Sequence, residues 1–265
     1  MQNVEHITVS LSGGIARFRV ERPERRNALT GAMYRSLAAL ILEAGADEAV
    51  RCIVIEGSHG NFTSGSDINA FLDVTPEQRE AHFALVADLF LAPSRASKPV
   101  IAAVAGHALG GGTGLAAACD LVVAEQDAVF GLPEIHLGLW PCTLLPAVIR
   151  AVGPRRAYEM ALLGETLTAE QARQIGLVTR VVPRGGLEEG VQVMANRIIA
   201  LPPRSVANGK GAFQDCLDLE FGKATAFMGR AMALNSAGAE AREGIAAFLG
   251  KRRPAWAADE GSIAL

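Results

Sequence analysis

The sequence has few of the residues that mark several common classes of protein. Only 5% of its 265 residues are aromatic, and none of its four cysteines lies close to another. Without a close pair, the cysteines suggest neither a metal site nor a redox couple. We therefore expect buried, reduced thiols and no bound metal. The four are Cys52, Cys119, Cys142 and Cys216.

An excess of one sign of charge is also lacking. The formal net charge is −3, and no basic run is longer than Lys251-Arg252-Arg253, which argues against nucleic acid or an anionic membrane as the main partner. No segment is long and uncharged enough to span a bilayer. The first residues contain no basic stretch leading into an apolar one, so we expect a cytoplasmic protein.

Apolar residues, in contrast, make up 50% of the chain, enough for one large core with a small appended module. Short apolar runs alternate with helix-like segments, which predicts an α/β core with a buried sheet. The predicted strands are 7–9, 15–20, 52–56, 100–104, 121–124, 128–130 and 178–182. The predicted helices are 31–46, 76–90, 143–151, 154–163 and 168–175.

The pattern changes at about Pro202. Three helices without a convincing strand are predicted from there, at 205–216, 219–235 and 239–249. Their apolar positions recur at helical spacing in a segment too small to close a core of its own. We therefore divide the chain into a core, 1–201, and an all-helical region, 202–265, that forms subunit contacts.

A glycine-rich run joins one predicted strand to a helix-like segment. Gly106-His107-Ala108-Leu109-Gly110-Gly111-Gly112 follows the apolar strand 100–104 and leads into 115–118. Glycines at such a junction leave backbone N–H groups bare, with the positive end of a helix dipole behind them. The run predicts a cradle for an anion or oxyanion, although a tight turn or a close helix–sheet contact would use glycines as well.

Two further segments add to this cradle. Residues 61–68, Asn-Phe-Thr-Ser-Gly-Ser-Asp-Ile, contain a second glycine turn with helix-capping residues at Ser66 and Asp67. Glu134 follows Pro133 in an apolar stretch, and apolar surroundings disfavour the charged form of a carboxyl group. Glu134 is thus a candidate proton shuttle, with a salt-bridged or surface glutamate as the alternative.

Taken together, these segments resemble the crotonase family, also called the enoyl-CoA hydratase/isomerase family. The resemblance extends over nearly the whole chain. It implies a spiral of strand–strand–helix units, a C-terminal helical region that builds trimers or hexamers, and an acyl-CoA thioester as ligand, with no cofactor besides the CoA of the substrate. The matching segments are 22–23, 26–29, 62–68, 98–112, 119–121, 130–138, 172–182, 244–248 and 251–252.

The resemblance also implies roles for single residues. The backbone N–H groups of Ser64 and Gly111 would form an oxyanion hole on the thioester carbonyl, and Glu134 would move the proton. For Arg25 and Arg26 the alternative is that they are simply solvated charges, and for Trp140 the alternative is that it packs in the core. The residues implied to contact CoA or the acyl chain are Arg25, Arg26, Ser66, Asp67, Ile68, Gly110, Trp140 and, from a neighbouring subunit, Lys251.

The chain departs from the family at one decisive position. Hydratases of the family carry a second glutamate two residues after the glycine triplet, where this chain has Gly114. One carboxylate suffices to move a proton between two carbons, so isomerisation of an enoyl-CoA fits more simply than hydration. Hydration with a non-carboxylate or substrate-supplied partner, and a catalytically silent acyl-CoA binder, are the alternatives. A glutamate introduced at position 114 should raise hydration if there is room for it.

Other residues could take the place of the missing glutamate. His82, His107 and His136 are candidate partners of Glu134, although single histidines are more often structural. Residues 112–117 also read G-x-G-x-x-A, as in dinucleotide-binding proteins, and an acid, Glu134, lies 20 residues beyond Gly114. In dinucleotide-binding proteins the acid of this motif lies at the end of the second strand. Glu134 instead comes after the predicted strand has ended, so a nucleotide-dependent oxidoreductase is disfavoured.

Overall fold

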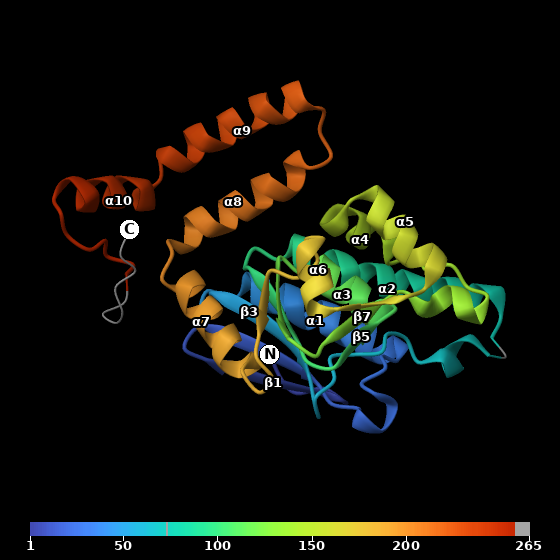
Figure 1. The fold of residues 1–265 in the computed structure, drawn as a ribbon. Helices are drawn as coiled ribbons and strands as arrows, with labels where there is room; N and C mark the ends of the chain where they lie inside the picture. The colour runs from blue at the N-terminus through green and yellow to red at the C-terminus, as the bar shows by residue number, and fades with distance from the viewer. Residues whose placement is uncertain (73, 258–265) are drawn as a thin grey trace.

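A computed structural model describes residues 1–72 and 74–257. The core of this structure is built on two sheets. The larger sheet has the strand order β1-β2-β3-β4-β6-β9, and every neighbouring pair is parallel except β1 and β2 (Figure 1). Its strands are β1 (Ile7–Ser12), β2 (Ile15–Val20), β3 (Cys52–Gly57), β4 (Val100–Val104), β6 (Leu121–Glu125) and β9 (Arg180–Val182).

The smaller sheet contains β5 (His107–Leu109), β7 (Val129–Gly131) and β8 (Thr166–Thr168). β5 follows closely after β4, and β7 after β6, so each time the chain crosses directly from the larger sheet to the smaller one. α3 (Gly111–Ala118) follows β5 and leads back to the larger sheet. Sheet-to-sheet steps followed by a helix form the strand–strand–helix spiral that the resemblance implies.

Helices cover both faces of the larger sheet, which explains its continuously apolar strands. On one face, Ile53 and Ile55 of β3 join the core formed with α1 (Gly31–Ala46), α2 (Pro76–Arg95) and α3. On the other face, Val54 packs in a second cluster with Val191 and Met194 of α7 (Leu187–Ile199). Side chains alternate across a strand, so both layers are needed to bury β3 completely.

Local sequence fixes where the helices begin. The Thr30 hydroxyl accepts a hydrogen bond from the Met33 amide and caps α1, as its position before the helix suggests. Thr75 and Gln78 form a reciprocal capping box at α2, where Pro76 occupies the first turn. Three short 3₁₀ helices, η1 (Pro23–Arg25), η2 (Ile68–Phe71) and η3 (Pro133–Leu137), lie in the connections between these elements.

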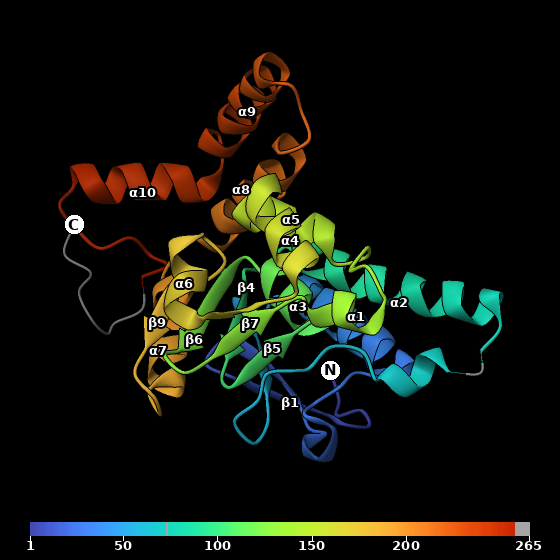
Figure 2. The same ribbon diagram turned by 45° about the vertical axis from the view of Figure 1, so that its right-hand side comes forward.

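The remaining helices are α4 (Leu145–Val152), α5 (Pro154–Leu163), α6 (Ala169–Gln174), α8 (Pro203–Cys216), α9 (Phe221–Ser236) and α10 (Ala239–Leu249). Both views show α9 and α10 standing away from the two sheets (Figures 1 and 2). Residues 258–265 of the predicted helical region fall outside the described chain. No helix in the described ranges is long and apolar enough to cross a membrane.

The predicted elements mostly match, but α7, β5 and β8 were missed. α7 has Gly190 in its interior, which lowers its helix propensity, and the two strands have only three residues each. α2 also continues beyond residue 90 to Arg95, past Pro93. In each case packing against neighbouring elements outweighs a weak or contrary local preference.

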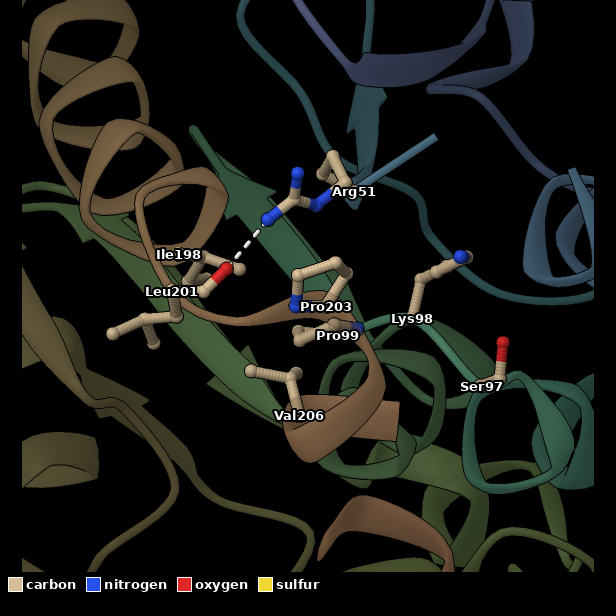
Figure 3. Close-up of a pocket in the computed structure, with 8 residues that line it drawn as sticks. All are labelled: Arg51, Ser97, Lys98, Pro99, Ile198, Leu201, Pro203 and Val206. Carbon is tan, nitrogen blue, oxygen red and sulfur yellow. Dashed lines mark hydrogen bonds between the residues drawn. The ribbon is translucent and has the colours of Figure 1, made fainter. Parts of the chain in front are cut away.

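The end of α7 is held to the larger sheet by Arg51. Its guanidinium donates to the carbonyl oxygens of Ile199 and Leu201, and Figure 3 shows the second of these bonds. The cavity beside it has a volume of about 10 Å³ and is lined by Pro99 and Val206 among others. A space of this size holds about one water molecule at most, so it is not a ligand site.

A buried ion pair joins α8 to the core. Lys210 of α8 lies 2.6 Å from Asp120, and its ammonium also donates to the carbonyl oxygens of Pro93 and Lys98. The Asp120 carboxylate accepts a further hydrogen bond from the Val100 amide. Burial raises the pKa of Asp120, and the Lys210 charge opposes this shift. The pair therefore fixes the start of the helical region against β4 and α2.

We expect Lys210→Met to lower the free energy of unfolding by about 3 kcal/mol at neutral pH, because it leaves a buried carboxylate without its partner. The loss should shrink as the pH falls, because protonation removes the uncompensated charge of Asp120. Denaturant titrations at several pH values measure both effects, with the exposed Lys223→Met as the matched control. Equal stability of the two variants would contradict the role given to this pair.

Candidate active site

The site forms where the loop 61–67 runs against the start of α3. The Thr63 amide donates to the His107 carbonyl, and the Leu109 amide donates to the Thr63 carbonyl, so the loop pairs with β5. A Cβ at Gly112 would lie only 2.1 Å from the Thr63 oxygen, and one at Gly65 would lie 2.7 Å from the Gly111 nitrogen. Glycine is required at both positions because two stretches of backbone touch there.

The hydrogen bonds of the loop decide which amides are free, and they correct the expectation for Ser64. The Ser64 amide donates to the Arg26 carbonyl at 3.1 Å, so it is not free to bind a substrate oxygen. The Gly110 amide is likewise taken by the Gly131 carbonyl at 2.8 Å. Ser64 is therefore replaced as a candidate donor, because its N–H points into the fold.

Two neighbouring amides are available at this contact. Gly111 is the first residue of α3, so its N–H has no acceptor within the helix. Ser66 pairs with Leu29 through the amide of Asp67 and the carbonyl of Gly65, and no described residue accepts from the Ser66 amide itself. A Cβ at Gly111 would lie 3.6 Å from the Ser66 nitrogen, so the two amides are neighbours. We call the Gly111 and Ser66 amides the amide pair.

A buried asparagine holds this loop in place. Asn27 is completely buried, and its side-chain amide donates to the carbonyl oxygens of Ser58 and Asn61. Its own carbonyl accepts from the Thr63 hydroxyl at 2.7 Å. The left-handed backbone of Asn27, with φ of 58°, places these groups against Asn61 and Thr63 at the start of the loop. Asn27 therefore acts as a structural support for the site.

Glu134 lies directly beside the glycine run. It stands in the first turn of η3, and one carboxylate oxygen comes within 2.7 Å of the place a Cβ on Gly110 would occupy. The other, Oε2, is buried and has no hydrogen-bond partner among the described residues. Burial raises the pKa of Glu134. The salt-bridged alternative is thus wrong for the described part of the chain, and a half-buried carboxylate with one unpartnered oxygen is suited to accepting a proton.

The position of the second family glutamate is filled by apolar atoms. A Cβ at Gly114 would lie 2.5 Å from Cβ of Leu144 and 3.0 Å from the ring of Phe90. Gly114 is one of the buried residues of α3. Position 114 therefore has no room for an added glutamate side chain.

The predicted CoA-binding residues fall into two groups. Arg25 and Arg26 are exposed beside the loop, where their carbonyl oxygens accept from the side chain and the amide of Ser64. Ile68 is 59% exposed on η2. The Asp67 carboxylate, in contrast, is paired with Arg22 at 2.8 Å and caps η2, and the Arg22 bond lowers its pKa.

Two other predicted residues lie elsewhere. The Trp140 ring packs on Tyr158 of α5, with ring centres 5.9 Å apart. Lys251 follows α10, which lies far from α3 in both views, so one chain does not bring Lys251 to the site (Figures 1 and 2). Contacts of Trp140 and Lys251 with a ligand therefore stay predictions, whereas the ion pair and capping contacts described above give Asp67 a structural role.

The three candidate histidines differ in their surroundings. His107 pairs with the side chain of Asn61 at 2.9 Å, and His136 is exposed and lies against Gly164. The ring of His82 stands edge-on to the ring of Tyr34, and burial lowers the pKa of His82.

The described part of the chain has no group of three or more His, Cys, Asp or Glu side chains that could hold a metal ion.

One site residue was missed from the sequence. Tyr34 of α1 is completely buried, and its hydroxyl lies 2.8 Å from the hydroxyl of Ser66. The sequence signal was slight: Tyr34 is one of only two tyrosines, and it stands on the apolar face of a predicted helix.

Comparison with known proteins decides the family. The sequence pattern described as enoyl-CoA hydratase/isomerase matches residues 10–259. The chain belongs to this family. It is therefore an acyl-CoA enzyme of the hydratase/isomerase type.

Several relatives in the family are similar over nearly their whole length. The 2,3-dehydroadipyl-CoA hydratase of Escherichia coli K12 is 35% identical over 254 residues, covering 95% of this chain and 98% of that protein. The human mitochondrial enoyl-CoA hydratase domain-containing protein 3 is 35% identical over 247 residues, covering 92% and 80%.

Solved structures confirm the crotonase fold. The enoyl-CoA hydratase of Mycobacterium smegmatis superimposes with a TM-score of 0.92 at 36% identity, covering 96% of this chain and 99% of that one. The human domain-containing protein 3 gives a TM-score of 0.91 at 32% identity, covering 95% and 100%. The core and the C-terminal helices are thus arranged as in this family.

The packing at Gly114 yields a test. Alanine normally favours a helix over glycine by about 1 kcal/mol, but Gly114→Ala should destabilise the protein by about 1–3 kcal/mol, because the added methyl group overlaps Leu144. Gly209→Ala on α8, where a Cβ meets no atom within 4 Å, is the matched control and should be neutral or stabilising. Thermal unfolding compares them. If Gly114→Ala is as stable as the control, position 114 has room, and Gly114→Glu becomes a fair test of hydration.

Proposed function

We propose that the protein binds an enoyl-CoA with the thioester oxygen between the amide pair and the acyl chain beside Glu134. Removing a proton next to a thioester gives an enolate, whose oxygen carries the new charge. Two fixed N–H donors stabilise such an oxygen by several kcal/mol, about 3–4 for one donor in comparable sites. The observation that carries the proposal is Glu134 beside Gly110, the residue before Gly111, with Oε2 buried and without a partner among the described residues.

The preferred reaction is the 1,3-shift of a proton in a 3-enoyl-CoA. Glu134 takes the proton from the carbon next to the thioester, the electron pair moves into the enolate, and the same carboxyl group returns the proton to the far carbon, which leaves a 2-enoyl-CoA. One carboxylate is enough for both transfers. The apolar packing at Gly114 supports this choice, because Leu144 and Phe90 occupy the place of a second acid.

Hydration of a 2-enoyl-CoA is the second candidate. The names of the relatives favour it, including the Escherichia coli 2,3-dehydroadipyl-CoA hydratase. The reaction needs a second polar group to hold the attacking water, and a polar group on the acyl chain could supply it. A substrate of that kind would distinguish this enzyme from hydratases that act on plain chains.

The ratio of the two reactions tests the proposal. On a panel of short, medium and aryl-substituted enoyl-CoAs, we expect isomerisation to exceed hydration, and Glu134→Gln to lose about 10²–10⁴-fold in rate. Because burial raises the pKa of Glu134, the acid limb of the pH profile should lie above the ordinary range of a glutamate. The exposed Glu165→Gln is the control. Hydration faster than isomerisation on every substrate would favour the second candidate, and a fully active Glu134→Gln would contradict both.

We also propose that the C-terminal helices join subunits into a trimer or hexamer. Large apolar side chains on α9 and α10 are exposed in the single chain, among them Phe221 at 84%, Leu234 at 78% and Phe248 at 75%. Exposed apolar surface of this extent is typical of an interface. A groove of about 1290 Å³ between α8 and the helices α2, α3 and α4 offers further surface to a partner.

Light scattering at micromolar concentration should give a mass three or six times that of one 27.8 kDa chain. The double variant Leu234→Asp/Phe248→Asp should shift this mass towards the single chain, because it places charges in the interface. Leu11→Asp, which changes an exposed leucine on β1, is the matched control. A wild-type protein that is only monomeric would contradict the proposed assembly.

A further inference from the structure

A tyrosine from α1 reaches the amide pair from inside the fold. The Tyr34 hydroxyl lies 2.8 Å from Oγ of Ser66, and it lies 3.1 Å from the place a Cβ on Gly111 would occupy. One buried phenol therefore lies beside both residues of the amide pair. Among the described residues, Ser66 is its hydrogen-bond partner.

The surroundings of Tyr34 show that its hydroxyl is not part of ordinary core packing. The buried face of α1 otherwise carries apolar side chains such as Met33, Leu37 and Ile41. A hydroxyl on that face costs free energy unless it is hydrogen-bonded. Its partner is the side chain of a loop residue, Ser66, although a phenylalanine would fill the same core volume.

The phenol is also kept neutral. Burial raises the pKa of Tyr34 to about 12, and the negative charge of Glu134 acts in the same direction. The Tyr34 O–H is therefore present over the whole pH range in which the enzyme could work. The edge of the His82 ring packs on the Tyr34 ring, with centres 5.7 Å apart, and restricts its movement.

The loop needs such support at Ser66. Gly65, with φ of 89°, precedes Ser66, and the segment belongs to no extended strand. An amide stabilises a developing charge only if it is held in position before the reaction, within about 0.5 Å. The single bridge to Leu29 fixes one side of Ser66, and the Tyr34 hydroxyl fixes its side chain.

We infer that Tyr34 is a positioning residue: through its hydrogen bond to Ser66 Oγ it sets the Ser66 amide relative to the Gly111 amide, so that the pair is arranged for an enolate oxygen. This inference rests on the proposed function and adds a residue from α1 to the site. Tyr34 acts through Ser66 and does not itself touch the reacting atoms.

The test compares two thioesters in the wild-type protein and four variants. Acetoacetyl-CoA forms an enolate that can be followed by its ultraviolet absorbance, whereas butyryl-CoA is saturated and forms none under the same conditions. We expect Tyr34→Phe and Ser66→Ala each to weaken enolate binding and lower kcat about tenfold, with butyryl-CoA affinity and KM within about twofold. The double variant should be no worse than either single variant, because both remove the same bond. Tyr158→Phe, the same change at the other tyrosine, is the control.

Each outcome supports or overturns the inference. Unchanged enolate affinity and kcat in Tyr34→Phe, equal loss for both thioesters, or additive losses in the double variant would overturn it. If Tyr34→Phe does not fold, Ser66→Ala tests the same bond alone, because it leaves the core intact. Failure of the proposed function looks different: the wild-type protein would then bind neither thioester, before any variant is compared.

Discussion

The site depends on the close approach of two stretches of backbone. The loop 61–67 can lie against the first turn of α3 only because Gly112 leaves room for the Thr63 carbonyl and Gly65 leaves room for the Gly111 amide. The contact brings the amides of Gly111 and Ser66 close together, whereas those of Ser64 and Gly110 donate to carbonyl oxygens within the fold. The strand–strand–helix spiral provides the frame, because β5 ends where α3 begins and β7 ends shortly before Glu134.

Burial then gives each polar group of the site its chemical character. Glu134 loses water without gaining a described partner for Oε2, which favours its neutral form and prepares it to exchange a proton with a carbon acid. Tyr34 is buried more deeply but keeps a partner, so it stays a neutral hydrogen-bonding group. Asp67 is held ionised by Arg22 and serves the loop. The two carboxylates, Glu134 and Asp67, thus have different roles because their contacts differ.

Much of the fold and the main parts of the site could be predicted from the sequence. The strands of the larger sheet and most helices follow from apolar periodicity, and the glycine run and Glu134 belong to short local motifs. Ser64 was wrong because the availability of its amide depends on the carbonyl of Arg26, a contact between distant segments that no local pattern encodes. Tyr34 was missed for the same reason, since its meaning comes from Ser66 across the fold. α7 was missed because Gly190 masks a helix that packing against β3, β4 and β6 stabilises.

In the proposed function, the Gly111 and Ser66 amides receive the thioester oxygen opposite Glu134. A crystal structure of the protein with a saturated acyl-CoA bound measures this most directly. We expect the thioester oxygen to lie about 2.7–3.2 Å from both amide nitrogens and the carbon next to the carbonyl to face the Glu134 carboxylate. A thioester oxygen bound elsewhere, or an acyl chain that lies away from Glu134, would contradict it.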